Sequence, residues 1–132
     1  MRLFLTFSAL LLAAACTRNE TVAAYGGADH VWQLSRIDGV PVSYVATLSF
    51  ATDGKVAGTG PCNEFAARQS APYPWFTLER FVATEMYCDK LADEQSFFAA
   101  LQEMSLSEVS GTRMILSNDA KREMLFTAVT GG

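Results

Sequence analysis

The side chains best suited to chemistry in this sequence of 132 residues are three cysteines and a single histidine. A catalytic thiol must be free, exposed and close to a general base. The only histidine is His30, which precedes the first predicted strand. Zinc ligands have recognisable spacings, and Cys62, Cys88 and His30 show none of them. The sequence therefore favours no catalytic thiol, no metal site and no cofactor.

Three acidic residues offer a second kind of chemistry. Glu64, Glu79 and Glu85 could supply paired carboxylates of the type that hydrolyse glycosidic bonds. Acidic side chains on the solvent face of strands are much more common. A small hydrolase is therefore the least favoured hypothesis, and no catalytic residue is assigned.

The first sixteen residues have the pattern of an export signal. Arg2 supplies a positive charge, an apolar stretch runs from Leu3 to Leu12, and three alanines precede Cys16. That stretch is too short to span a bilayer, which requires about 20 residues. A cysteine directly after small residues resembles the lipobox of bacterial lipoproteins, in which the thiol receives a diacylglycerol. The resemblance implies that the signal peptide, residues 1–15, is removed and that Cys16 anchors the chain to a membrane.

The residues around the cysteine refine this expectation. Thr17 follows it, so the aspartate that usually retains lipoproteins in the inner membrane is absent. The lipobox resemblance therefore implies an outer-membrane anchor that faces the periplasm. Ala13 departs from the usual pattern, which has leucine three residues before the cysteine. Residues 16–29 are expected to form the lipidated N-terminus and a flexible tether, and residues 30–132 one domain.

The mature chain is acidic and retains two cysteines. Removal of Arg2 with the signal leaves nine basic and 14 acidic residues, a formal charge of −5. This charge disfavours nucleic acid as a partner. With Cys16 assigned to lipid, Cys62 and Cys88 remain in an oxidising compartment, where a disulfide is chemically available to them.

Alternating apolar residues predict the first strands. One strand is expected over 31–37, ending at Asp38-Gly39, and a second over 44–50. Asp53-Gly54 predicts a hairpin after the second strand, with a type I′ turn that has positive φ at both central residues.

The second half of the chain contains one helical pattern between β candidates. Prolines and small residues predict a loop over 66–74, and β character returns over 75–87. Apolar residues at helical spacing predict one principal helix near 91–104. Three short strands are expected after it, over 105–109, 114–116 and 124–129. This order predicts a mainly β (α+β) fold: a compact antiparallel sheet, barrel-like, with the helix over an opening.

Two segments carry the most specific information, Gly58-Thr59-Gly60-Pro61-Cys62-Asn63 and Thr84-Glu85-Met86-Tyr87-Cys88. Together with Trp32-Gln33-Leu34 and with Glu94 in the predicted helix, they resemble the META domain family, that of the HslJ-like bacterial envelope lipoproteins. The resemblance covers 31–129, and it departs from the family at Pro61, where glycine is more frequent.

The family resemblance implies a barrel-like β fold with one helix and a disulfide between Cys62 and Cys88. It implies a loose link to envelope stress and no established catalytic activity.

The residues of these motifs also have a structural interpretation of their own. Thr84, Met86 and Cys88 alternate, so they are expected to share one face of a strand. Asn63 is suited to a sharp turn. The remaining positions are explained by close backbone approach or by the core, and they are Gly58, Gly60 and Trp32.

Tyr73 and Trp75 are the candidates for an exposed contact surface, in a contact loop expected over 66–75. The leading hypothesis is a non-enzymatic envelope lipoprotein that binds an envelope protein or a small apolar ligand, or supports the envelope under stress. The alternative is a periplasmic inhibitor of a protease or lysozyme, which would present this loop to the enzyme.

Overall fold

The computed structural model describes residues 19–129, so the predicted signal peptide and the lipidation of Cys16 lie outside the described residues. The elements of the described chain, in order, are η1 Val22–Tyr25, η2 Gly27–Asp29, β1 Trp32–Ile37, β2 Val40–Pro41, β3 Thr47–Phe50, β4 Lys55–Thr59, β5 Glu64–Arg68, β6 Glu79–Ala83, α1 Leu91–Glu103, β7 Leu106–Ser110, β8 Arg113–Ser117 and β9 Glu123–Ala128. Within this range, no helix is long and apolar enough to cross a membrane.

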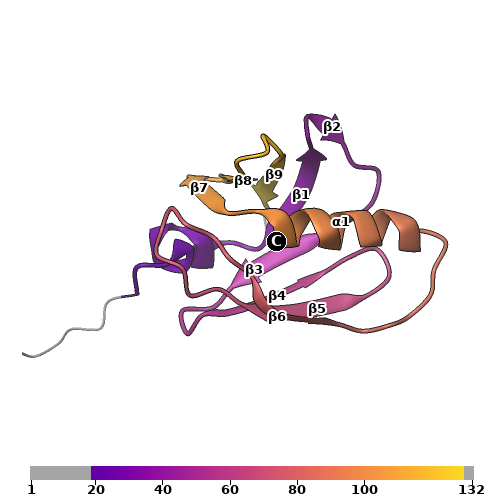
Figure 1. Ribbon diagram of the computed structural model, residues 1–132, viewed down its shortest axis with the longest axis horizontal. Coiled ribbons are helices and arrows are strands. Elements are labelled where there is room, and N and C mark those ends of the chain that lie inside the picture. The colour runs from indigo at the N-terminus through magenta and orange to yellow at the C-terminus, as the bar shows by residue number, and fades with distance from the viewer. Residues whose placement is uncertain (1–18, 130–132) are drawn as a thin grey trace, which may run out of the picture.

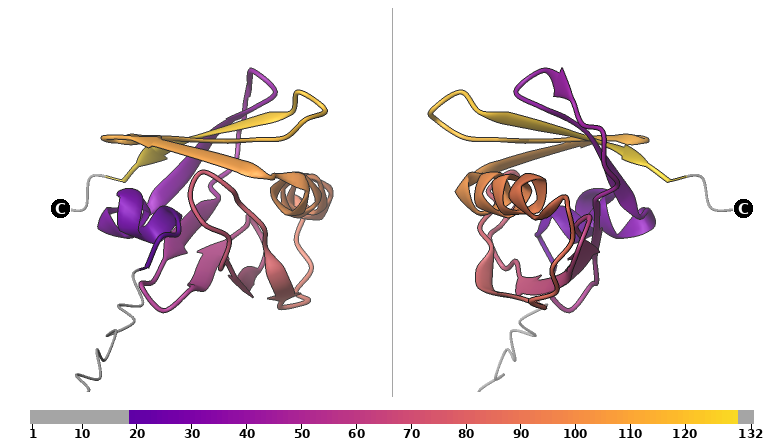
Figure 2. Two further views of the ribbon diagram at one scale, coloured as in Figure 1. Left: turned by 60° about the vertical axis from the view of Figure 1, so that its left-hand side comes forward. Right: turned by 90° about the vertical axis from the view of Figure 1, so that its right-hand side faces the viewer.

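The nine strands of the described chain form one antiparallel sheet. Eight of them follow the order β6-β5-β4-β3-β1-β9-β8-β7, and β2 pairs with β1. The sheet curls, so that β7 to β9 and β4 to β6 lie on opposite sides of α1 (Figures 1 and 2). This arrangement confirms the predicted mainly β fold with one principal helix.

The turn with positive φ at both central residues lies in a different hairpin from the one that the sequence predicted. The predicted hairpin of β3 and β4 is confirmed, but only Gly54 has a positive φ (88°), and its N–H donates to the carbonyl of Ala51. This geometry is a three-residue loop with a bulge at the glycine. The two-residue turn with positive φ at both positions is the turn of β1 and β2, at Asp38 (51°) and Gly39 (79°).

The interior of the curled sheet is filled with large apolar side chains. Alternate residues of the strands point inward, and α1 adds Phe97 and Leu101, both fully buried. Trp32 is also fully buried, and its indole N–H donates to the carbonyl of Gly27 at 2.8 Å. The other fully buried apolar side chains in the described range are Val22, Ala46, Leu48, Phe76, Ala100, Met114, Leu116, Met124 and Phe126.

The prediction of a flexible tether is wrong for residues 21–29. These residues form η1 and η2, and Val22 and Ala23 are buried in the core. Asn19 is already held by the domain, because its side-chain amide donates to the carbonyl of Thr52 at 2.9 Å. The apolar pair covers one end of the sheet, and burial of this surface outweighs the entropy of a free tether.

The predicted loop over 66–74 begins later than expected. Residues up to Arg68 belong to β5, in which Phe65 and Ala67 alternate with exposed residues. The loop therefore spans 69–78. Gln69, 2% exposed, organises it, because its side-chain oxygen accepts the N–H of Ala71 and its side-chain amide donates to the carbonyl of Ala71.

An ion-paired cluster joins three separated elements on the surface. Arg122 contacts Asp38 at 3.1 Å and Glu103 at 2.9 Å. Asp38 also accepts the backbone N–H of Glu123 at 3.0 Å. That backbone donor, followed by the Arg122 guanidinium, lowers the pKa of Asp38 below its ordinary value of 3.8.

We expect Asp38→Asn to remove a pH-dependent contribution to stability. Because the pKa of Asp38 is lowered on folding, its contribution is complete above the unfolded pKa and is lost as the pH falls through the folded pKa. Asparagine tolerates the positive φ of this turn, so the backbone should be retained. Thermal melting should therefore show wild type above the variant at pH 7, with the gap closing below about pH 4.

Asp119→Asn is the matched control, since Asp119 is exposed and forms no ion pair with any residue from 19 to 129. A difference between Asp38→Asn and wild type that stays constant across this pH range would contradict the assignment.

Candidate functional site

The centre of the candidate site is a buried carboxylate, Glu94, in the first turn of α1. The residue is 1% exposed. Its Oε2 accepts the backbone N–H groups of Cys62 and Asn63, each at 2.7 Å, and its Oε1 accepts the side-chain amide of Asn63. Three donors from two adjacent residues therefore hold the turn between β4 and β5 against the helix. We call this arrangement the Glu94 clamp.

Backbone dipoles, and not a cation, stabilise the carboxylate. None of the Lys, Arg and His residues within 19–129 forms an ion pair with Glu94. The two N–H groups converge on Oε2, and the positive end of the α1 dipole lies at the same place. Burial of a carboxylate is unfavourable without such hydrogen bonds. The clamp therefore requires all three donors together.

Two glycines make the close packing around the clamp possible. A Cβ on Gly60 would lie 2.5 Å from Oε2 of Glu94. A Cβ on Gly58 would lie 2.1 Å from the carbonyl oxygen of Thr47 and 2.5 Å from the ring of Phe65. Neither glycine has a positive φ. Both are required because a side chain has no room, and not because of an unusual backbone conformation.

The side chain of Asn63 extends the clamp to the segment 84–88. Its Oδ1 accepts the N–H of Met86 at 2.6 Å and the hydroxyl of Thr84 at 2.9 Å, and its Nδ2 donates to the carbonyl of Met86 at 3.0 Å. The Asn63 amide thus pairs with both polar groups of one residue's backbone, as a neighbouring strand would. One side chain links helix, turn and segment.

A disulfide between Cys62 and Cys88 closes the same corner covalently. Their Cα atoms lie 5.6 Å apart and the sequence separation is 26 residues. A crosslink of this length contributes about 3–4 kcal/mol in the chain-entropy view. Cys62 therefore takes part in two restraints, through its sulfur and through its backbone N–H.

The prediction that Thr84, Met86 and Cys88 share one face of a strand is wrong. The strand β6 ends at Ala83, and residues 84–88 have no regular secondary structure. The side chain of Met86 points outward, with 67% of the residue exposed. The backbone of Met86, and not its side chain, makes the inward contact. The Asn63 amide forms with it the two hydrogen bonds that a neighbouring strand would form.

A shallow groove lies beside the clamp and has an apolar rim. Its volume is about 450 Å³, and its lining includes Phe81, Leu91 and Phe98. Met86 and Tyr87, which is 84% exposed, form its rim. We call these two residues the Met86–Tyr87 rim. The site thus combines a rigid backbone with large apolar side chains in solvent.

The structure brings two of the three acidic candidates of the sequence analysis, Glu64 and Glu85, to one open cleft of about 490 Å³ beside the clamp, and Glu79 does not line it. Glu64 on β5, Glu79 on β6 and Glu85 in the following segment are all exposed. His30 packs edge-on against Trp32, with ring centroids 5.3 Å apart. No three His, Cys, Asp or Glu residues between 19 and 129 gather in a way that could hold a metal ion.

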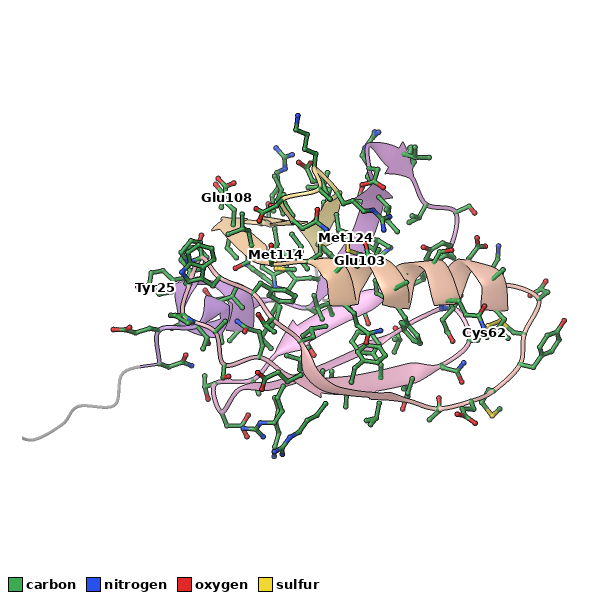
Figure 3. All side chains as sticks on the ribbon, viewed as in Figure 1. Tyr25, Cys62, Glu103, Glu108, Met114 and Met124 are labelled. Atoms are coloured by element: carbon green, nitrogen blue, oxygen red, sulfur yellow. A yellow bond between two sulfur atoms is a disulfide. The ribbon has the colours of Figure 1, made fainter. Side chains whose placement is uncertain are left out.

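The contact residues predicted in the loop lie at the other end of the molecule. Trp75 is 58% exposed and Tyr73 is half-buried. The loop runs along the free edge of β7, where Ser107 donates its N–H to the carbonyl of Pro74 at 2.7 Å, and Trp75 forms a bridge with Leu106. Tyr25, which marks this end, and Cys62 are far apart in Figure 3.

The sequence placed Glu94 in the helix, but it did not identify this residue as the acceptor for the backbone N–H groups of Cys62 and Asn63. An acidic residue in a first helical turn is common, because it suits the helix dipole. Its neighbour Asp93 has the same chemistry and is exposed. The helical stripe through Phe97 and Leu101 was the available signal, since Glu94 precedes them at spacings of three and seven.

These features define the class of protein: a small, mainly β domain in which a half-barrel sheet encloses one helix, with one corner held by a disulfide and a buried glutamate. The sequence matches the META domain over residues 27–130, so the chain belongs to the META domain family.

Solved structures show the same fold. A protein from Burkholderia xenovorans, solved by NMR, is 20% identical, with a TM-score of 0.68 over 83% of this chain and 88% of that one. A DUF4847 family protein from Bacteroides vulgatus, solved by crystallography, is 12% identical, with a TM-score of 0.69 over 84% of this chain and 99% of that one. No curated protein matches the chain significantly.

We expect Glu94→Gln to destabilise the domain by about 2–3 kcal/mol. The glutamine amide would direct an N–H₂ group at a donor, either the Asn63 amide or the two backbone N–H groups, so at least one charge-assisted hydrogen bond is lost and a buried donor is left without a partner. Chemical denaturation monitored by circular dichroism measures the change.

Asp93→Asn is the matched control, because it removes the same charge from the same helical turn at an exposed position. It should change the unfolding free energy by less than about 1 kcal/mol. Equal effects of the two substitutions would mean that the helix dipole, and not the clamp, accounts for the role of Glu94.

Proposed function

We propose that this META-domain protein is a non-enzymatic lipoprotein of the cell envelope that binds an exposed apolar segment of another envelope protein at the Met86–Tyr87 rim. One observation supports this site above all. Tyr87 has the most exposed large apolar side chain of the described chain, and it follows Met86, whose backbone N–H and carbonyl both form hydrogen bonds with the Asn63 amide. A rigid backbone lowers the entropy lost on binding.

The side chains of the rim suit a protein partner. Met and aromatic residues are enriched at protein interfaces. Methionine adapts its shape to different apolar surfaces, and tyrosine combines a large apolar area with a polar end. The groove is open and shallow, whereas small-molecule sites enclose most of their ligand. An apolar segment of a protein therefore fits better than a small apolar molecule.

Addition of a strand to the sheet is the less favourable mode of binding. The free edge beside the rim belongs to β6, which pairs irregularly with β5 and contains Arg80 at a φ of 54°. Bulges and charged residues protect edge strands from pairing with other chains. The partner should therefore contact side chains, and not the edge.

The location follows from the sequence expectations at the N-terminus. A lipid on Cys16 would attach the domain to a membrane, and Thr17 favours the outer membrane with the domain in the periplasm. A role in envelope integrity under stress agrees with such a position.

The inhibitor hypothesis has less support from the geometry. It requires the loop over 69–78 to be ordered and also to protrude toward an enzyme. Gln69 and the contacts with Ser107 order the loop, but they hold it along the edge of β7.

A photo-crosslinking amino acid at position 87 should capture a defined envelope partner in intact cells. The same group at Val40, which is 64% exposed at the start of β2, is the control. Met86→Ser should weaken the adduct from position 87, since it removes apolar area from the interface. Equal adducts from both positions, or none from position 87, would refute the proposed binding site.

Mass spectrometry of the mature protein should find a diacylglycerol on Cys16 and no residues before it. Cys16→Ser should abolish the modification. An unmodified mature N-terminus at another residue would contradict the anchor and would leave the binding site on the domain untouched.

A further inference from the structure

A second exposed apolar surface lies at the end of the molecule opposite the clamp. Tyr25 is 53% exposed and Trp75 is 58% exposed. The ring of Tyr25 stacks on that of Tyr73, with centroids 4.4 Å apart and planes 7° from parallel. We call the Tyr25–Tyr73 stack, together with Trp75 two residues further along the same loop, the aromatic patch. Figure 3 shows Tyr25 at the end where the described chain starts, far from Cys62.

The aromatic patch is held rigidly against the start of the chain. The N–H of Tyr73 donates to the carbonyl of Glu20 at 2.6 Å, and its hydroxyl accepts the N–H of Val109 at 3.2 Å. The bridge between Trp75 and Leu106 fixes the backbone on the other side of the patch. The exposed rings thus sit on a framework tied to the residue that follows Asn19.

The length of chain before Asn19 sets how far the patch can be from a membrane. Only Thr17 and Arg18 stand between Cys16 and Asn19, so this connection spans at most about 11 Å when fully extended. A lipid on Cys16 would therefore keep this end of the domain at the headgroup layer. A long flexible tether, by contrast, would leave the orientation of the domain open.

We propose that the aromatic patch docks on the bilayer that holds the Cys16 lipid, an inference that rests on the proposed lipid anchor. Tyr and Trp favour the membrane interface, where their rings are in apolar surroundings and their polar ends stay hydrated. Docking of the patch orients the domain. The Met86–Tyr87 rim then faces away from the membrane, toward partners in the periplasm.

The charges near the patch select the type of lipid surface. Glu20, Asp29 and Glu108 are exposed acidic residues on the segments that carry or contact the patch. They repel anionic headgroups, and they outnumber the one cation of the short connection to Cys16, Arg18. The surface is therefore suited to zwitterionic phospholipid, with attraction supplied by the rings and the covalent lipid, and not by charge.

Tryptophan fluorescence tests the docking directly, because the mature protein has one exposed and one buried tryptophan. Trp32 is inaccessible, so an aqueous quencher such as acrylamide reports mainly on Trp75. The purified mature lipoprotein is reconstituted in phosphatidylcholine vesicles. Trp75 should lose accessibility to acrylamide relative to unlipidated protein that begins at Thr17, in solution, and its emission should fall when the phosphatidylcholine carries brominated acyl chains.

The matched control moves the indole to the other end of the domain. In the double variant Trp75→Phe and Tyr87→Trp, the new indole should stay accessible to acrylamide and should not be quenched by brominated lipid. Quenching at both positions would overturn the proposed orientation. Protein that floats with the vesicles while Trp75 remains accessible would overturn the docking and leave the lipid anchor intact.

Failure of the proposed lipid anchor gives a different result from failure of the docking. Mature protein that does not float with the vesicles overturns the lipid on Cys16, and the docking with it. An anionic variant of the experiment, with phosphatidylglycerol in the vesicles, should reduce the quenching of Trp75, and an increase would contradict the role of the acidic residues.

Discussion

The hydrogen bonds between the Glu94 carboxylate and the backbone of Cys62 and Asn63 are the interaction on which the described corner of this domain depends. They position the N-terminal end of α1 inside the curled sheet. A charged group at this depth is stable only while its donors surround it, which makes the geometry of the turn a requirement and not a preference. Gly60 has no side chain because the carboxylate occupies the space.

The disulfide and the Asn63 amide act on the same corner in different ways. The disulfide between Cys62 and Cys88 limits the unfolded chain, whereas the amide specifies the path of the segment 84–88 in the folded state. Together they hold a segment without regular secondary structure as firmly as a strand. This explains how Tyr87 can be exposed on a fixed backbone.

The two exposed apolar surfaces lie at opposite ends of the domain (Figure 3), so the two ends of the fold differ in the surface that they present. The aromatic patch is joined to the start of the described chain through Tyr73 and Glu20, and the rim is joined to the helix through Asn63 and Glu94. The side chains of both surfaces are in solvent, whereas the strands that connect the two ends bury their inward-facing side chains in the core. A half-barrel with a solid core separates the end that carries the aromatic patch from the end that carries the Met86–Tyr87 rim.

The sequence by itself determined the mainly β class, the single helix and the hairpin at Asp53-Gly54, because periodicity and turn preferences act over a few residues. It also supplied the motif of glycines, cysteines and Asn63 that marks the family. Only the tertiary structure decided that Met86 contributes its backbone and exposes its side chain, and that residues 21–29 pack as part of the domain. The physical reason is that a polar side chain such as Glu94 or Asn63 finds its donors 20 or more residues away, and no local pattern encodes such a partner.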